Sequence, residues 1–204
     1  MGKPPWMSVS NGFRHDSPTD HPCQPWYEPD EVVRGILSTV PPGRRSRILI
    51  VGCGSDLPSV RLARETGAEV VSVDVHPPDP ALPLEECSLD HVWCLGATTH
   101  VEDLPRFTQE LMRVLRPGGR ALVVDTYWDG FRPPRFANQA GRPWHAVATK
   151  SVVSLLSRSG LTDVEVLPWL SAMAPEAMNG AGSALAEDLA DGRLSPALVV
   201  ARKP

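Results

Sequence analysis

Two glycines and two aspartates are spaced in this sequence as they would be around a nucleoside-bearing ligand. The glycines, Gly52 and Gly54, follow an apolar run, and glycine lets a ligand approach the backbone closely. Asp74 comes 20 residues after Gly54 and ends the next apolar run, a spacing at which a carboxylate reaches ribose hydroxyls. Asp56 stands where the dinucleotide fingerprint has its third glycine, and its charge would repel a pyrophosphate but favour a cationic group. The pattern therefore favours S-adenosylmethionine, whose sulfonium and ammonium groups are positive, over NAD.

Two histidines are candidate general bases. His100 follows a third apolar run, and imidazole titrates near neutral pH, so it suits the deprotonation of a hydroxyl or an amine. The competing interpretation is a histidine that enters a helix and bonds to the backbone. His145 is the second candidate, and Thr98 and Thr99 offer hydroxyls to a substrate.

Aromatic side chains are concentrated in the segment 126–148, which we expect to form a loop over the substrate. They suit a flat, partly apolar small molecule, and they are Tyr127, Trp128, Phe131, Phe136 and Trp144. Three arginines in the same loop, Arg132, Arg135 and Arg142, admit a carboxylated or phosphorylated substrate. The alternative is that half of these aromatics belong to the core or to an oligomer contact. Trp26 and Tyr27, in a proline-rich arm at 1–28, form either a lid or a surface contact.

The elements that position these residues alternate between strand and helix. Apolar runs predict strands at 47–52, 68–75, 89–96, 120–125, 161–168 and 196–204, and apolar stripes predict helices at 29–40, 57–67, 102–119, 149–160 and 174–192. Such alternation implies a Rossmann-like α/β domain at 29–204, with a mostly parallel sheet and one antiparallel edge strand. Because ligands bind at the carboxyl ends of such strands, the glycines, Asp74 and His100 are expected on one edge.

The composition of the 204-residue chain bounds its class. Its hydrophobic fraction of 42% and charged fraction of 22% are ordinary for a globular protein, and its net charge of −4 argues against a nucleic-acid partner. No apolar run is long enough to span a membrane, and we expect a cytoplasmic protein. The four cysteines have no metal-binding spacing, so we expect no metal site and reduced thiols. Cys53 and Cys94, at the ends of adjacent strands, lack an evident activating partner for a catalytic thiol.

Several segments resemble the class I S-adenosylmethionine-dependent methyltransferases. They are ILIVGCGSDLPSVRLA, VVSVDV, the stretch SLDHVWCLGATTHVEDLPRFTQELMRVLRPGGRALVVD and the closing ALVVARKP. The resemblance implies a seven-stranded sheet with one reversed strand. It also implies that Gly52, Cys53 and Gly54 line the methionine part of the cofactor, that Asp74 binds the ribose and Val75 the adenine, and that Leu95 and Gly96 flank the sulfonium and adenosine. We expect Ser55 and Asp56 to complete this set.

The sequence departs from the family pattern in three places. Ile50 stands where the family has an acid, and Asp56, in place of the third glycine, is a hypothetical substitute for it. The segment between Asp74 and Ser88 carries four prolines and is too short for the usual helix and strand. We therefore expect the sheet to lack an outer strand, with Leu84, Glu85 or Glu86 reaching the adenine.

The function expected from these residues is methyl transfer to a small molecule, such as a tailoring step in the biosynthesis of a secondary metabolite. One alternative keeps the fold and the pocket but catalyses a cyclisation, an elimination or a rearrangement. Another is a non-catalytic binding partner of a different enzyme.

Overall fold

A computed structural model of the chain describes residues 29–52, 57–74, 81–128, 130–135, 138–139, 142–143, 145–167 and 183–204. The arm at 1–28, with Trp26 and Tyr27, lies outside the described residues. So do Cys53, Gly54, Ser55, Asp56, Val75, Phe136 and Trp144.

Strands and helices alternate along the described chain. The helices are α1 (Pro29–Thr39), α2 (Leu57–Thr66), α3 (Leu104–Val114), α4 (Thr149–Arg158), α5 (Ser183–Ala190) and the short 3₁₀ helix η1 (Thr98–His100). The strands are β1 (Arg47–Gly52), β2 (Glu69–Asp74), β3 (Leu89–Leu95), β4 (Leu115–Trp128), β5 (Asn138–Gln139), β6 (Arg142–Pro143), β7 (Thr162–Leu167) and β8 (Leu194–Arg202).

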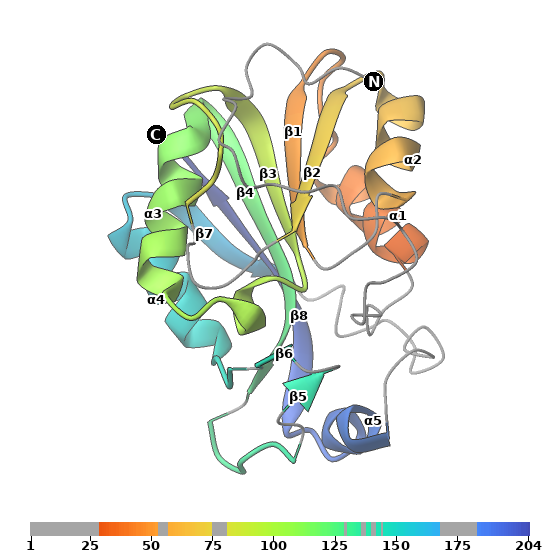
Figure 1. Ribbon diagram of the computed structural model, residues 1–204, viewed down its shortest axis with the longest axis vertical. Helices are drawn as coiled ribbons and strands as arrows, with labels where there is room; N and C mark the ends of the chain where they lie inside the picture. The colour runs from red at the N-terminus through yellow and green to blue at the C-terminus, as the bar shows by residue number, and fades with distance from the viewer. Residues whose placement is uncertain are drawn as a thin grey trace.

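One six-stranded sheet, in the order β2-β1-β3-β4-β8-β7, forms the centre of the molecule (Figure 1). Strands β2, β1, β3 and β4 are parallel, and β8 is antiparallel to both β4 and β7. The prediction of a Rossmann-like α/β fold with one reversed strand is confirmed, but the reversed strand β8 lies one place inside the sheet, and β7 is the edge strand. In the described part of the chain β2 ends the sheet, as expected from the short segment that follows it.

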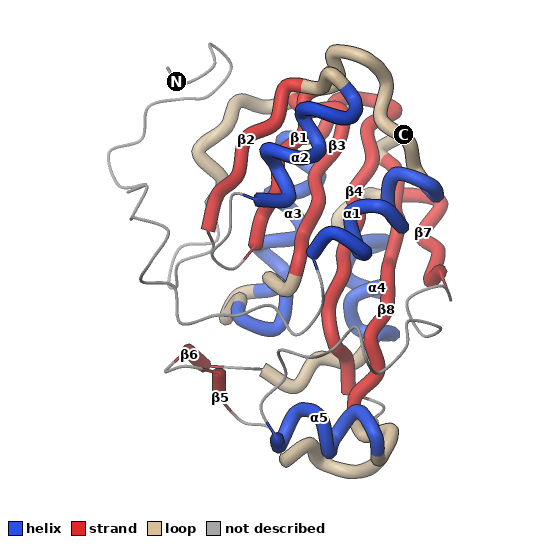
Figure 2. The backbone as a smooth tube through the Cα atoms, turned by 90° about the vertical axis from the view of Figure 1, so that its right-hand side faces the viewer, coloured by secondary structure: helices blue, strands red, loops and turns tan. Residues whose placement is uncertain are grey.

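Two hydrophobic clusters hold the helices on the sheet. Phe107, Leu111 and Leu156, from α3 and α4, pack on one face, and Val33, Ile36 and Leu62, from α1 and α2, pack on the other. The stripe on α3 matches the helical spacing that predicted it. The result is a three-layer arrangement, and α5 with the β5–β6 hairpin lies beyond one end of the sheet (Figure 2).

The boundary between α3 and β4 differs from the sequence prediction. The helix was expected to continue to residue 119, but it ends at Val114, and Leu115 is already extended and paired with Leu89 of β3. Pairing between β3 and β4 therefore begins before Pro117. Strand β4 also continues to Trp128, so Tyr127 and Trp128 lie on a strand and not in a loop as expected.

Candidate functional site

The carboxyl ends of three adjacent strands meet at one point of the sheet edge. Gly52, the last residue of β1, is in register with Asp74 of β2 on one side and Leu95 of β3 on the other. A Cβ atom added to Gly52 would lie 2.7 Å from the carbonyl oxygen of Leu95, closer than real Cβ contacts allow. Gly96 then turns with φ +65°, and its amide donates to the Val124 carbonyl at 2.8 Å. Glycine at 52 is therefore required by the strand packing itself.

The arrangement at this edge fits an adenosyl ligand. Gly52 at the end of β1 lies between Asp74 at the end of β2 and Leu95 at the end of β3, next to the Gly96 turn. Ligands of open α/β sheets bind at the carboxyl ends of the strands. The cofactor roles assigned to these residues from the sequence stay predictions.

Leu84, which was expected to reach the adenine, is a buried core residue. Its side chain is buried in the cluster under α3, and its carbonyl oxygen accepts a hydrogen bond from Arg113 Nη1 at 2.9 Å. Because Arg113 is in the last turn of α3, this position is near the amino-terminal end of β3. Glu85 and Glu86 are exposed beside it. The geometry therefore gives Leu84 a packing role, and the adenine contact stays a prediction.

A buried carboxylate, Asp125 of β4, organises the turn that follows β3. Its Oδ2 accepts from the Thr98 hydroxyl at 2.7 Å and the Thr99 amide at 3.0 Å, and its Oδ1 accepts from the Thr126 amide at 2.8 Å. The Thr99 hydroxyl lies 3.1 and 3.2 Å from the two oxygens. Burial raises the pKa of the Asp125 carboxyl, and the Thr98 hydroxyl, the two amides and His100 oppose that shift. The threonines thus bind Asp125, although Thr99 was expected to contact the substrate.

Tyr127 completes this network from the next inward-facing position of β4. Its hydroxyl lies 3.3 Å from Thr98 Oγ1, and since the Thr98 proton is already donated to Asp125, Tyr127 is the donor. Burial and the nearby Asp125 raise the pKa of the Tyr127 hydroxyl well above its ordinary value, so it stays protonated. Tyr127 was expected to line the substrate site, and no role was predicted for Asp125. A polar residue that ends a buried strand was the available signal for Asp125.

The two candidate histidines lie on segments that are bonded to each other. His100 is buried on η1, and the His145 amide donates to the Thr99 carbonyl at 2.7 Å. The structure therefore brings together the turn after β3 and the end of the loop after β4. Both histidines as bases stay predictions.

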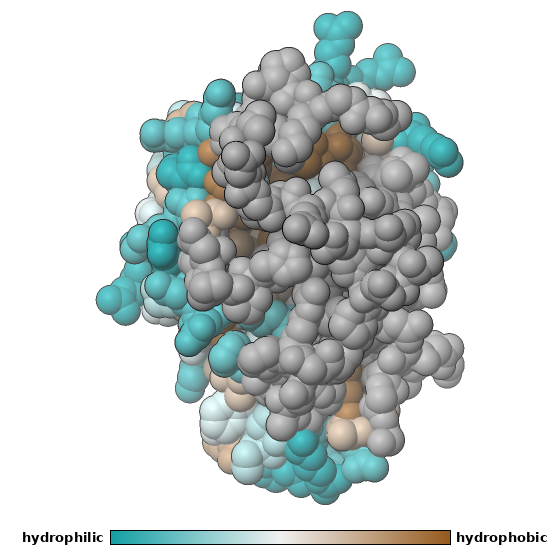
Figure 3. Space-filling view, in the orientation of Figure 1, coloured by the Kyte–Doolittle hydropathy of each residue, from teal (hydrophilic) through white to brown (hydrophobic). Residues whose placement is uncertain are grey.

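The arginines of the described loop point toward α5. Arg132 Nη2 donates to the Asp191 carbonyl at 2.7 Å, and Arg135 pairs with Glu187 at 2.9 Å. Trp128 Nε1 donates to the Arg132 carbonyl at 2.6 Å, whereas Phe131 is 88% exposed. Figure 3 shows hydrophilic side chains gathered over this end of the molecule. The backbone of Arg142 belongs to β6.

Other chemistry has little support in the described part of the chain. Burial and then Asp125 raise the pKa of the Cys94 thiol, which disfavours a nucleophilic thiolate. Among the residues with described positions, no group of three metal-binding side chains occurs. No helix in this part of the chain is long and apolar enough to cross a membrane.

Comparison with known proteins finds similarity to methyltransferases. A family model described as a methyltransferase domain matches residues 79–123. A 2-methyl-6-phytyl-1,4-hydroquinone methyltransferase of Synechocystis sp. is 34% identical over 112 residues, which are 45% of this chain and 35% of that protein. The chain spans about a third to a half of the length of the curated relatives it matches.

Solved structures share the fold at low sequence identity. A phosphoethanolamine N-methyltransferase of Haemonchus contortus, in complex with S-adenosylhomocysteine, has a TM-score of 0.70 at 18% identity. The match covers 85% of this chain and 53% of that protein's chain. The [4+2]-cyclase SpnF has a TM-score of 0.65 at 17% identity. That match covers 98% of this chain and 88% of the SpnF chain.

Proposed function

We propose that this chain, a member of the class I S-adenosylmethionine-dependent methyltransferase superfamily, binds S-adenosylmethionine and catalyses methyl transfer to a small molecule. The observation that carries the proposal is the meeting of Asp74, Gly52 and Leu95 at one sheet edge, with the His100 turn directly after β3. A methyl donor bound at these strand ends would lie next to the turn that carries the candidate base.

The cofactor half of the site is the edge formed by β2, β1 and β3. Gly52, Cys53, Gly54, Ser55 and Asp56 would hold the methionine part, and Asp74 and Val75 the ribose and adenine. Leu95 and Gly96 would flank the sulfonium, which supplies an electrophilic methyl group when bound. Proximity and in-line alignment account for much of the rate of such a displacement.

The acceptor half is formed by η1, the end of β4 and the loop after it. His100 or His145 would take the proton of the acceptor, and Thr99 and Trp128 would line its site, with Trp26 and Tyr27 in a lid at 1–28. A hydroxyl acceptor on a partly apolar ring fits this lining. The name of the Synechocystis relative supports 1,4-hydroquinones, with and without a prenyl tail, as the first probes. Free Cys87 and Cys94 and the net charge of −4 support a cytoplasmic location without a nucleic-acid partner.

Two observations favour a second candidate, a cyclisation or rearrangement in the same pocket. The sheet ends at β2 in the described residues, so the outer strand of the family pattern is not among them. The likeness to SpnF also extends over 98% of this chain.

Calorimetric titration with S-adenosylmethionine and S-adenosylhomocysteine tests the proposal. We expect both to bind, and we expect Gly52→Ala to weaken binding at least about tenfold, because its Cβ displaces the Leu95 strand end. Gly43→Ala is the matched control, since its Cβ would meet only the Ser46 hydroxyl, at 3.4 Å. Absence of binding at millimolar ligand would refute methyl transfer. Binding without transfer of radiolabelled methyl to any hydroquinone, amine or prenyl diphosphate would favour the second candidate.

A further inference from the structure

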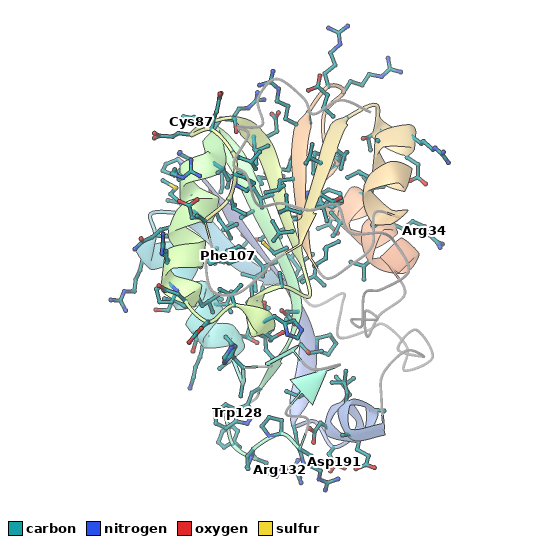
Figure 4. The ribbon with its side chains drawn as sticks, in the orientation of Figure 1. Arg34, Cys87, Phe107, Trp128, Arg132 and Asp191 are labelled. Carbon is teal, nitrogen blue, oxygen red and sulfur yellow. The ribbon has the colours of Figure 1, made fainter. Side chains whose placement is uncertain are left out.

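Charged side chains connect the loop after β4 to α5 and to the turn that precedes β8. Arg135 pairs with Glu187 and, at 3.4 Å, with Asp191, and Arg193 Nη1 donates to the Pro133 carbonyl at 3.0 Å. Arg132 donates to the Asp191 carbonyl, and Figure 4 shows Trp128, Arg132 and Asp191 together at this end of the molecule. The loop 130–135 is therefore held against α5 along its length.

Asp188 is the buried centre of this connection. Its side chain is 0% exposed, its Oδ2 accepts from the Arg135 amide at 2.6 Å, and its Oδ1 faces Arg193 Nε at 3.6 Å. A buried carboxylate is unfavourable unless a cation and hydrogen-bond donors compensate it. Arg193 is the cation, and the donor to Oδ2 is the backbone of the loop itself, so the carboxylate fixes the course of the chain at Arg135.

Residues on both sides of this loop, at the end of β4 and just before α4, are hydrogen-bonded on the acceptor half of the site. The Trp128 amide donates to the Val147 carbonyl at 2.9 Å, and the His145 amide donates to Thr99 beside His100. The Trp128 indole also donates to the Arg132 carbonyl, three residues before the Asp188 contact. The position of Arg132 therefore determines where the Trp128 ring lies.

We infer that Asp188 is a positioning residue for the methyl acceptor, acting through loop 130–135 on Trp128. This inference rests on the proposed function, because it assigns the acceptor to that side of the sheet. Strands β4 and β8 are two and three places from β1, and neighbouring strands are about 4.8 Å apart. Asp188 thus affects the acceptor site while the cofactor site at Gly52 lies beyond its contacts.

Asp188→Asn and Glu187→Gln are the matched pair that tests this role. Asparagine keeps an oxygen for the Arg135 amide but removes the charge that faces Arg193, whereas Glu187 is an exposed partner of Arg135 on the same helix. Three quantities would be measured on the full chain: amide hydrogen exchange of 130–135 and 145–148, the Kd of S-adenosylhomocysteine, and kcat and KM for a prenylated 1,4-hydroquinone. Arg193→Lys serves as a second variant if Asp188→Asn does not fold.

For Asp188→Asn and Arg193→Lys we expect about tenfold faster exchange in the loop and about tenfold higher acceptor KM, with the Kd of S-adenosylhomocysteine within about twofold of wild type. Glu187→Gln should leave all three quantities nearly unchanged, since exposed ion pairs contribute little. Unchanged loop exchange, or a parallel loss of cofactor affinity, would overturn the positioning role. Failure of the wild type to bind S-adenosylhomocysteine would instead refute the proposed function, and the exchange data would still decide the role of Asp188 in holding the loop.

Discussion

At the residue scale, we expect the buried Asp125 carboxylate to affect turnover through the position of the His100 turn. Replacing it by asparagine puts an amide NH₂ against a backbone amide of Thr99 or Thr126, so that two donors face each other. For Asp125→Asn we expect turnover to fall at least about tenfold, because displacement of the His100 turn disrupts the alignment of acceptor and methyl group. The Kd of S-adenosylhomocysteine should change little, and steady-state kinetics with calorimetry would measure both.

The matched control for Asp125→Asn is Thr108→Val. Thr108 is also buried, but its hydroxyl donates to the Pro105 carbonyl within α3 and not to the His100 turn. A comparable loss of stability with unchanged kcat is expected for Thr108→Val. Equal losses of kcat in the two variants would show that Asp125 acts on stability alone.

His91 gives a pH-dependent contribution to stability. Burial lowers its pKa from 6.5 to about 4, with Asp90 opposing and Arg120 and Arg116 adding to the shift. As the pH falls below 6.5 the unfolded chain protonates His91 and the folded chain does not, so stability is lost between pH 6.5 and about 4. At about 1.4 kcal/mol per pH unit, the advantage of the wild type over His91→Gln in free energy of unfolding should shrink by about 2 kcal/mol from pH 7 to pH 5. Urea unfolding of both proteins at the two pH values would measure it, and a difference independent of pH would contradict it.

At the element scale, the sequence patterns predicted the strands and helices because their signals are local. The apolar run at 47–52 and the stripe Leu104, Phe107 and Leu111 need no partner to be recognised. The end of α3 at Val114 was missed because it depends on pairing between Leu115 and Leu89, which are distant in sequence. The Asp125 and Asp188 contacts were missed for the same reason, since both join segments that meet only in the folded chain.

The segment 81–88, which precedes β3, is held by an ion pair on α3. Arg113 donates to the carbonyls of Leu82 and Leu84 and pairs with Glu110 at 2.7 Å, and Glu110 accepts from the Leu82 amide at 2.9 Å. Arg113→Met should lower the free energy of unfolding by about 1–3 kcal/mol, because it leaves part-buried carbonyls without a donor. Guanidinium chloride titrations would measure this, with Arg64→Met on the exposed side of α2 as a control that changes it by less than about 0.5 kcal/mol. Equal effects of the two substitutions would show that the segment does not depend on Arg113.

At the scale of the whole molecule, one sheet carries both halves of the proposed site. The cofactor half uses the ends of β2, β1 and β3, while the acceptor half uses η1, the end of β4 and the loop after it. Because β3 and β4 are paired over most of the length of β3, the halves share a hydrophobic core and are expected to unfold together.

A ligand that binds only the folded sheet should therefore stabilise the entire chain. S-adenosylhomocysteine at about 100 times its Kd should add about 2.7 kcal/mol to the free energy of unfolding. For a chain of this size that corresponds to a rise in Tm of roughly 5–10 °C, measurable by calorimetric melting. Asp188→Asn should show the same rise from a lower starting Tm, because its contacts lie in the acceptor half. If the ligand instead bound and left the Tm of the wild type unchanged, the cofactor edge would belong to a unit that unfolds separately from the rest of the sheet.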